Sequence, residues 1–445
     1  MAVASTHDRR AGQDGNRHVL RAVIASCVGW SLDLYDLFLL LFVAPTIGRL
    51  FFPSEHAMLS LAAVYASFGV TLLMRPLGSA LFGTYADVRG RKRAMIVSMI
   101  GVGVSTALFG ALPTVATVGI AAPILFLLLR LVQGVFVGGV VAATHTIGTE
   151  SVAPRWRGAV SGLIGGGGAG LGALIASLAF YVMSALFPGD AFEQWGWRCM
   201  FFTGLVSALL GITIFSKLEE SPMFKKLQEA KKLSTAKKSP LRTLFSVEYR
   251  SILFVNLLLT IGGGSGYYLT SGFLPTYLKV VNKTPAETAG FIMMLSSIAV
   301  IIASVASGHL STLIGRKKTF LWMGVARLFL LPAIALLMAG VTDSVTLALY
   351  VIVFSMLGCA GFAPVLIFLN ERFPTAIRAT GTGLSWNIGF AIGGILPTFV
   401  SLGSPTPAHV PLTLALFLGA ISVIFLIGAM IVPETLGKLD EPEAA

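Results

Sequence analysis

Apolar residues occur in twelve long stretches separated by short polar segments, and this alternation dominates the 445-residue chain. Each stretch is long enough for a transmembrane helix, which needs about 20 predominantly apolar residues. One long polar interruption, at residues 217–250, divides the stretches into six and six. The expected helices span residues 20–46, 57–82, 94–113, 117–143, 159–187, 197–216, 251–278, 286–313, 319–340, 345–369, 380–402 and 410–432.

This pattern predicts an all-α membrane protein with twelve transmembrane helices in two six-helix bundles. The expected parts are an N-terminal cytoplasmic tail, a first bundle, a cytoplasmic linker loop, a second bundle and a C-terminal cytoplasmic tail. They occupy residues 1–18, 19–216, 217–250, 251–432 and 433–445.

Composition supports a membrane protein and excludes an ordinary soluble enzyme. The chain is 55% hydrophobic and 12% charged, with a mean hydropathy of +0.84, whereas a soluble protein carries about 25% charged residues. The sequence offers no nucleophile–base set, no metal-ligand cluster and no phosphate-binding loop. We therefore expect neither an enzyme nor a cofactor or metal site.

The net charge of +12 reflects Lys and Arg residues that gather in the loops on one side of the predicted membrane. Of the 32 Lys and Arg residues, 25 lie in segments on the N-terminal side of the predicted membrane and four on the opposite side. Basic residues collect in cytoplasmic loops. The distribution predicts that both termini lie in the cytoplasm, and it explains the positive charge without a nucleic-acid partner. We expect a multi-pass protein of the plasma (cell inner) membrane that acts as a monomer.

The two halves of the chain repeat each other. Between the second and third helices the chain reads Gly83-Thr-Tyr-Ala-Asp87-Val-Arg-Gly90-Arg91-Lys-Arg, and 225 residues later it reads Gly308-His-Leu-Ser-Thr312-Leu-Ile-Gly315-Arg316-Lys-Lys. A second pair lies 221 residues apart: Glu150 precedes Arg157 by seven residues, and Glu371 precedes Arg378 by seven. Duplicated halves are typical of transporters with a central site.

The first of these loops resembles the signature loop of the major facilitator superfamily. The stretch from Arg130 to Gly139 resembles that superfamily's fourth helix, and Trp197-Arg198, Glu219-Glu-Ser-Pro222 and Pro433-Glu-Thr435 resemble its sugar porters. Asp33-Leu-Tyr-Asp36 resembles the first helix of its proton-coupled organic-acid and phosphate symporters, and Ser385-Trp-Asn387 resembles its metabolite:proton symporters. Glu150-Ser151, followed by Pro154 and Arg157, resembles its sialate/lactate-type organic-acid:proton symporters. The resemblance implies two bundles that rock about a central cavity.

Charged residues near the cytoplasmic ends of the helices are candidates for gating. Asp87 can accept hydrogen bonds from nearby arginines or a helix N-terminus, whereas the second copy of the loop has Thr312 in its place and should hold more weakly. The alternative is that these charges serve sidedness alone. The candidate gating residues are Asp87, Arg91, Arg75, Glu150, Arg157, Glu371 and Arg378.

Two acids lie deep in the first helix. Asp33 and Asp36 are about 12 and 15 residues from its cytoplasmic start, roughly 18 and 22 Å into the membrane, and their i, i+3 spacing places them on one face. Desolvation and mutual repulsion both favour protonation of such a pair. We therefore predict that Asp33 and Asp36 couple transport to protons; the alternative is a structural role.

Arg130 lies near the middle of the fourth helix, with Gln133 on the same face. A buried guanidinium can hold a carboxylate through two parallel hydrogen bonds, so both residues are predicted to bind substrate. A fixed ion pair of Arg130 with Asp33 or Asp36 is the alternative. Arg327 is expected to lie shallow in its helix and reach the membrane surface.

Further polar and aromatic residues are candidates to line the central cavity, although packing explains each equally well. These are Tyr35, Asn256, Tyr267, Tyr268, Trp386 and Asn387. Gly262-Gly-Gly264 is expected to permit local unwinding of the seventh helix. The glycine-rich fifth helix, residues 162–172, is expected to pack closely against a neighbour.

These features predict a secondary active transporter that takes up a small organic anion, most simply a carboxylate, together with protons. The partners are then an anionic small molecule, the proton and the lipid bilayer. A sugar or polyol porter and a facilitator remain alternatives. Multidrug efflux is weaker because the fifth helix has no Gly-Pro pair, and phosphate symport is weaker because an Asp-Tyr-Pro stretch is missing from the fourth helix.

Overall fold

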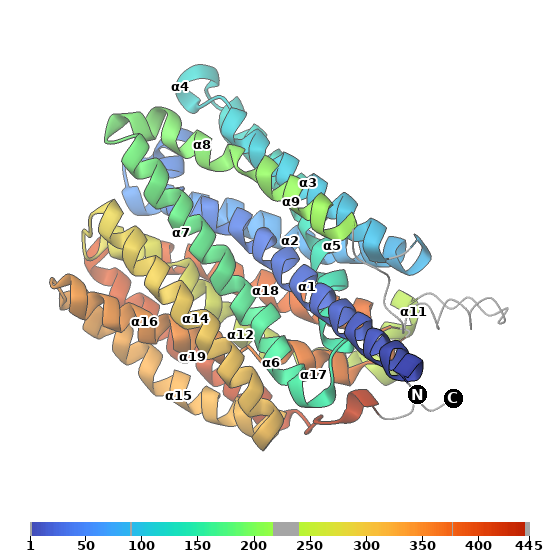
Figure 1. Ribbon diagram of the computed structural model, residues 1–445. Helices are drawn as coiled ribbons and strands as arrows, with labels where there is room; N and C mark the ends of the chain where they lie inside the picture. The colour runs from blue at the N-terminus through green and yellow to red at the C-terminus, as the bar shows by residue number, and fades with distance from the viewer. Residues whose placement is uncertain (1, 90, 217–239, 376, 441–445) are drawn as a thin grey trace.

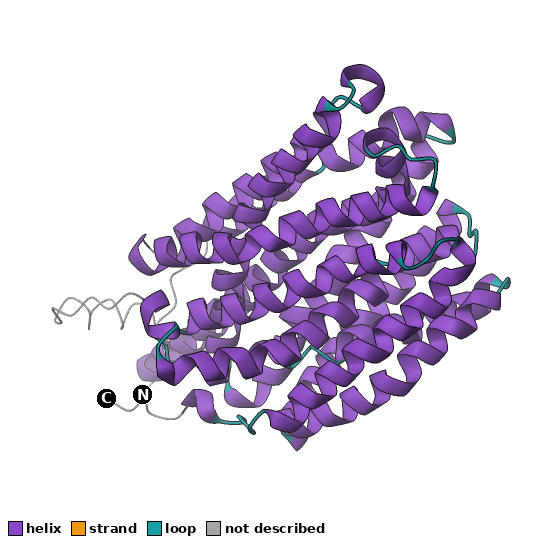
Figure 2. Ribbon diagram, turned by 180° about the vertical axis from the view of Figure 1, so that it is seen from behind, coloured by secondary structure: helices purple, strands orange, loops and turns teal. Residues whose placement is uncertain are grey.

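The computed structural model describes residues 2–89, 91–216, 240–375 and 377–440. These residues form helices joined by short connections, and no strand occurs among them (Figures 1 and 2). Twelve helical segments are long and apolar enough to cross a membrane. They are Val19–Phe51, Ala57–Gly83, Lys92–Ala111, Ala121–Val140, Pro154–Leu186, Phe192–Ile214, Val247–Val280, Ala286–Ile314, Arg316–Gly340, Ser344–Arg372, Arg378–Leu402 and Pro407–Ile431.

The predicted spans agree with these segments to within about a turn and a half of helix at every end. The helices in chain order are α1 (Ala2–Phe51), α2 (Ala57–Arg89), α3 (Arg91–Ala111), α5 (Ala121–Glu150), α6 (Arg157–Gly162), α7 (Gly168–Leu186), α8 (Trp197–Phe202), α9 (Gly204–Ser216), α11 (Pro240–Leu244), α12 (Val247–Tyr267), α13 (Leu274–Val280), α14 (Ala286–Ile314), α15 (Arg316–Leu337), α16 (Ser344–Ala360), α17 (Val365–Arg372), α18 (Arg378–Leu402) and α19 (Val410–Ile431), with the short α4 (Val115–Val118).

Helix α1 begins earlier than the sequence suggested. It starts at Ala2, so the predicted polar tail of residues 1–18 continues directly into the first span. No proline precedes Pro45, so nothing in this segment breaks the helical hydrogen-bond pattern. Residues 217–239, most of the predicted linker loop, lie outside the described residues.

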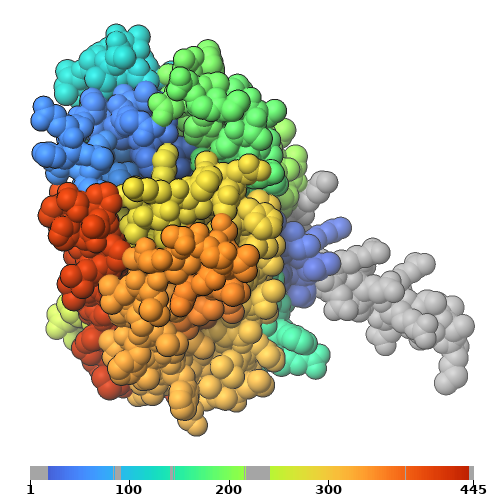
Figure 3. All heavy atoms as spheres, turned by 90° about the vertical axis from the view of Figure 1, so that its left-hand side faces the viewer, coloured from blue at the N-terminus to red at the C-terminus, as the bar shows by residue number. Residues whose placement is uncertain are grey.

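The two halves of the chain form two groups of helices packed side by side. In Figure 1 most of α1 to α9 lies in the upper part and α12 to α19 in the lower part, with α6 reaching down beside α17. Figure 3 shows the two halves from another side. Helix α1 begins, and the described chain ends with η7 (Lys438–Asp440), at the same end of the bundle, near α17 (Figure 1). We call this the terminal end and the other the opposite end.

One seam between the halves consists of the fifth span against α14. Gly158, Gly162, Gly166 and Gly170 recur every four residues and face α14. A Cβ at Gly158 would lie 2.2 Å from the Gly308 carbonyl oxygen, and one at Gly162 2.1 Å from the Ser304 carbonyl oxygen. Small residues at this spacing let two helix backbones touch. The expected close packing of the glycine-rich helix is confirmed.

The seventh span is irregular, but one turn later than expected. Helix α12 remains regular through the triple glycine and continues into a π-helical turn, η4 (Tyr268–Gly272), before α13. The triple glycine serves packing instead, because Cβ atoms there would lie within 3.0 Å of Phe425, Phe362 and Phe390. A second π-turn, η2 (Leu163–Gly167), interrupts the fifth span. Such bulges occur frequently at functional sites.

Candidate functional site: a buried charge cluster and a closed central cavity

Helix α1 holds its two aspartates in the interior of the first half. Asp33 and Asp36 are each 1% exposed. Their i, i+3 spacing places both carboxylates in one small cavity of about 10 Å³, close to the smallest space that admits a water molecule. The cavity is lined by Asp33, Asp36, Leu37, Phe68, Thr71, Arg75, Arg130, Gln133 and Val137.

Arg75 of α2 is the cation that faces Asp33. Its Nη1 atom lies 3.6 Å from Asp33 Oδ2, and both side chains are almost fully buried. This distance is longer than the 2.7–2.9 Å of a tight charge-assisted hydrogen bond. The sequence suggested a gating role at a helix end for Arg75, whereas the structure places it in the cavity with both aspartates and Arg130. We call these four residues the charge cluster.

Arg130 of α5 lies on the other side of the same cavity. Its Nη1 donates to Gln133 Oε1 (2.8 Å), and Gln133 Nε2 donates to the Thr106 hydroxyl (2.8 Å). Its guanidinium also stacks over Phe109, 4.1 Å from the ring centroid. The described residues give Arg130 no ion pair within 4.0 Å, although Asp36 lies within its electrostatic range.

A second cavity lies between the two halves. It also measures about 10 Å³ and is lined by Phe38, Ala169, Gly170, Ala173, Tyr267, Ser271, Met293, Ser296, Ser297 and Val300. These residues belong to the first and fifth spans of one half and the seventh and eighth spans of the other. We call this the central cavity. Ser271, Ser296 and Ser297 give its otherwise apolar wall a polar side that the sequence reasoning missed.

Aromatic rings from both halves close around the central cavity. Phe38 meets Tyr267 with 6.0 Å between ring centroids, and Phe68 meets Tyr268 at 5.4 Å. Trp386, stacked on Phe390, meets Trp30 of the first half edge-on at 5.8 Å. Ring contacts across the interface therefore hold the cavity closed in this conformation.

Four of the six predicted cavity residues lie at the interface and contact the first half of the chain. Tyr267 and Tyr268 have buried hydroxyls without a hydrogen-bond partner, and Trp386 joins the aromatic cluster. Asn387 Nδ2 donates to the Ser79 hydroxyl (2.6 Å), which links α18 of one half to α2 of the other.

Tyr35 and Asn256 lie elsewhere. The Tyr35 hydroxyl contacts the Thr203 hydroxyl, within the first half. Asn256 is buried on α12, eleven residues and about 16 Å before Tyr267, and lines neither of the two cavities described above. Helix geometry explains Tyr35, because two residues from Asp33 correspond to a rotation of about 200° to another face.

Both ends of the interface are closed. At the opposite end the Tyr65 hydroxyl bonds the Thr276 hydroxyl across the halves (2.7 Å). At the terminal end Arg378 Nη1 lies 3.0 Å from Glu150 Oε1, and Asn370 Nδ2 donates to Thr149 (2.9 Å). The conformation is therefore occluded.

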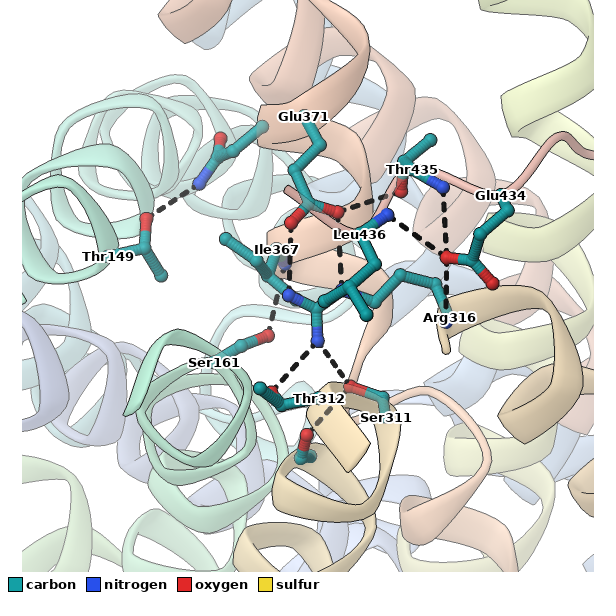
Figure 4. Close-up of polar contacts among 12 residues, drawn as sticks. Thr149, Ser161, Ser311, Thr312, Arg316, Ile367, Glu371, Glu434, Thr435 and Leu436 are labelled. Atoms are coloured by element: carbon teal, nitrogen blue, oxygen red, sulfur yellow. Dashed lines mark hydrogen bonds and ion pairs between the residues drawn. The ribbon is translucent and has the colours of Figure 1, made fainter. Parts of the chain in front are cut away.

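A dense polar network lies at the terminal end of the second half (Figure 4). Arg316 binds Glu371 through two hydrogen bonds, Nη2 to Oε1 (2.9 Å) and Nε to Oε2 (3.2 Å). Arg316 Nη1 also donates to Ser311 and Thr312. Both members of the ion pair have side chains 1% exposed. The Thr435 hydroxyl donates to Glu371 as well (2.7 Å).

The structure pairs Glu150 with Arg378 of the other half and Glu371 with Arg316 of its own half. In the second loop, Thr312 accepts a bond from Arg316, and Glu371 supplies the acid that binds this arginine. Glu371 therefore ties its own half, and Glu150 spans the two.

The remaining predicted gating residues are described only in part. Arg157 is buried at the terminal end. The side chains of Asp87 and Arg91 lie outside the described residues, so their gating roles stay predictions.

Glu434 caps α15 from outside the membrane span. Its Oε1 accepts from the backbone N–H of Arg316 (2.9 Å) and its Oε2 from that of Lys317 (3.1 Å). Gly315, at φ +101°, makes room, because a Cβ there would lie 2.4 Å from Glu434 Oε2. Partial burial alone would raise the pKa of Glu434, but the backbone N–H donors of Arg316, Leu436, Lys317 and Thr435 outweigh it and lower that pKa.

We expect Glu434→Gln to lower the free energy of unfolding by about 1 kcal/mol, as for loss of a helix cap. Because the pKa of the folded state is lowered, the wild-type advantage is present above the ordinary glutamate pKa and disappears as the pH falls through the folded-state pKa. Thermal unfolding in detergent at neutral and acidic pH measures this. Equal wild-type and variant stability at pH 7 would contradict the capping role.

Twelve membrane-spanning helices around a closed central cavity, with charges buried beside it, define a membrane transporter with an internal site. Residues 22–398 match the Major Facilitator Superfamily, and the chain belongs to this family. It is a multi-pass protein of the inner membrane and a transporter, not an enzyme.

Several curated transporters are similar to it over nearly their whole length. The inner membrane metabolite transport protein YhjE of Escherichia coli is 28% identical, over 98% of this chain and 99% of that protein. The glycine betaine/proline/ectoine/pipecolic acid transporter OusA of Dickeya dadantii is 29% identical, over 94% and 84%.

Solved structures share the fold. The proton:xylose symporter XylE bound to 6-bromo-6-deoxy-D-glucose gives a TM-score of 0.76 at 16% identity, covering 96% of this chain and 99% of that one. A partially occluded inward-open conformation of XylE from E. coli gives 0.73 at 17% identity, covering 95% and 99%.

Proposed function

We propose that the protein is a symporter that takes up a small carboxylate-bearing metabolite together with protons. One observation carries the proposal: Asp36 and Arg130 face the same enclosed cavity, and the described residues give neither an ion-pair partner within 4.0 Å. Charges held in this way within the membrane are costly and mark functional sites. A carboxyl that exchanges a proton with the solvent as the protein changes conformation accounts for them.

The Asp33–Arg75 contact offers a route from protonation to substrate binding. Protonation of Asp33 removes the negative charge that holds Arg75, and Arg75 then presents a free guanidinium beside Tyr268. A guanidinium fork suits a carboxylate better than an uncharged sugar. Proton binding would thus prepare the cavity for the anion, which is the coupling that symport requires.

Arg130 fits the alternative role, as a partner of the buried aspartates, better than it fits substrate binding. It lines the charge cluster rather than the central cavity, so we assign it and Gln133 to Asp36 instead of to the substrate. When Asp36 is ionised, Arg130 compensates its charge. When Asp36 is protonated, stacking on Phe109 and the bond to Gln133 hold the guanidinium in place.

The aromatic cluster favours one kind of carboxylate in particular. Tyr267, Tyr268, Trp386 and Phe390 form continuous ring contacts beside the central cavity, and aromatic rings attract quaternary ammonium groups. Two relatives are named as transporters of proline and of betaine or glycine betaine. Both compounds carry a carboxylate and a cationic nitrogen, which is quaternary in glycine betaine and a secondary ammonium in proline. A zwitterionic carboxylate is therefore the second candidate substrate.

Alternating access would proceed from the occluded form by release of either end. Opening the terminal end must separate Glu150 from Arg378, and opening the opposite end must separate Tyr65 from Thr276. We further propose that the terminal end faces the cytoplasm, because most Lys and Arg residues lie in its loops. The protein is proposed to act as a monomer.

We expect Glu150→Gln to bias the protein toward opening at the terminal end, because Arg378 loses its acid across the interface. Single-molecule or spin-label distances between α5 and α17 should lengthen in the variant. A charge-reversed pair, Glu150→Arg with Arg378→Glu, should restore the wild-type distance. Unchanged distances in Glu150→Gln would contradict the latch.

The function is tested by uptake into liposomes from a labelled panel of lactate, succinate, proline, glycine betaine, xylose and phosphate. Each is offered with and without an inward proton gradient. We expect accumulation of a carboxylate that collapses with a protonophore. Gradient-independent xylose uptake would instead indicate a facilitator and leave the aspartates a structural role.

A further inference from the structure

Arg327 is a third buried cation that the charge cluster does not use. It lies eleven residues into α15, about 16 Å from the terminal end of that helix, and is 0% exposed. The expectation that it reaches the membrane surface is therefore wrong. The helix begins at Arg316, earlier than predicted, which places Arg327 deeper, and α12 and α19 cover it.

The protein satisfies this guanidinium only in part. Nη2 donates to the Gly262 carbonyl oxygen (2.9 Å), and the group stacks over Phe425, 4.7 Å from the ring centroid. Nε and Nη1 have no hydrogen-bond partner, and no ion pair involves Arg327 among the described residues. A buried charge left without a counter-ion is strongly unfavourable, so this arginine has a reason beyond stability.

The backbone around Arg327 is kept free of side chains. A Cβ at Gly266 would lie 1.7 Å from Nη2, and one at Gly361 would lie 2.8 Å from Nη1. Glycine at both positions lets the guanidinium lie directly against α12 and against the end of α16. The residues that follow these glycines, Tyr267 and Phe362, belong to the aromatic cluster and contact each other (5.6 Å).

Two short chains of neighbouring residues connect Arg327 to the central cavity. Through Gly266 the guanidinium adjoins Tyr267, whose side chain lines the cavity and whose hydroxyl has no partner. Through Cys359, which lies within electrostatic range of Arg327, it reaches Ser271, because the Cys359 sulfur lies 3.6 Å from the Ser271 hydroxyl. Ser271 also lines the cavity and lies in the π-turn η4.

The balance of charge in the middle of the membrane points in the same direction. Away from the helix ends, the described residues include three fully buried guanidinium groups, of Arg75, Arg130 and Arg327, but only two buried carboxylates, of Asp33 and Asp36. One positive charge remains in excess when both acids are ionised. A monoanionic carboxylate would neutralise it.

We propose that Arg327 is the anchoring cation of the second half for the substrate carboxylate, which reaches it where Tyr267 and Ser271 line the central cavity. The π-turn η4 is the segment whose rearrangement would expose the guanidinium, since its helix is already irregular there. The substrate class follows: the ligand carries at least one ionised carboxylate. This assignment rests on the proposed function.

The test uses full-length Arg327→Gln and Arg327→Lys in liposomes. The probe is whichever of lactate, succinate, proline and glycine betaine the wild type accumulates, with its primary amide as competitor. We expect Arg327→Gln to raise the half-saturating carboxylate concentration about 10- to 100-fold, with a smaller rise for lysine. Competition by the amide, which lacks the charge of the replaced carboxylate, should stay unchanged. Arg198→Gln is the matched control, because Arg198 also donates to backbone carbonyls but lies outside both cavities.

Carboxylate-induced thermal stabilisation provides a second reading that needs no transport, and Arg327→Lys serves where the glutamine variant does not fold. Loss of this stabilisation in the variants supports the assignment. An unchanged half-saturating concentration with unchanged stabilisation would overturn it, as would an equal loss for carboxylate and amide. If the wild type accumulates no carboxylate at all, the proposed function itself has failed, and the two failures are thus distinct.

Discussion

Asp36→Asn is expected to abolish proton-driven accumulation of substrate while leaving exchange across the membrane. With one proton per carboxylate, a gradient of one pH unit supports about tenfold accumulation. Asparagine has nearly the shape of aspartic acid but cannot release a proton, so the variant should reach only equal concentrations on the two sides. Uptake and counterflow in the same liposomes measure both quantities.

The control for this variant is Asp343→Asn. Asp343 accepts a hydrogen bond from the Thr346 N–H at the start of α16 and lies at the surface, away from the charge cluster. Its variant should accumulate substrate normally. Retention of pH-driven accumulation by Asp36→Asn would remove Asp36 from the coupling mechanism.

Glu371→Gln is expected to lower the free energy of unfolding by about 3–5 kcal/mol, the usual result of leaving one partner of a buried ion pair uncompensated. Arg316 is 1% exposed and would lose both charge-assisted bonds to Glu371. Chemical or thermal unfolding in detergent, followed by helical content, measures the change.

The double variant Glu371→Gln with Arg316→Gln separates lost charge balance from lost packing. It removes the buried guanidinium as well, so it should be more stable than the single variant. If the single variant loses less than about 1 kcal/mol, as expected for an exposed ion pair, the buried ion pair does not stabilise this end of the second half.

The spans and the duplication of the halves could be predicted because each can be recognised from short stretches of sequence. A run of about 20 apolar residues has few alternatives to a membrane helix. The Gly83 and Gly308 loops are recognisable wherever they lie in three dimensions. The i, i+3 spacing of Asp33 and Asp36 likewise fixes a shared face without reference to any other helix.

The partners of the charged residues could not be predicted, because they depend on how helices far apart in sequence meet. Asp33 faces Arg75, and Glu150 faces Arg378 from the other half of the chain. The burial of Arg327 was missed for a similar reason, since α12 and α19 cover it, and also because its helix begins earlier than predicted.

The coupling of proton and carboxylate movement is the central claim, and proton movement tests it most directly. Protein in weakly buffered liposomes, without an imposed gradient, is supplied with the transported carboxylate while the external pH is recorded. We predict that the external solution becomes more alkaline as substrate enters, and that Asp36→Asn shows no such change. Carboxylate entry in the wild type without proton uptake would contradict the account.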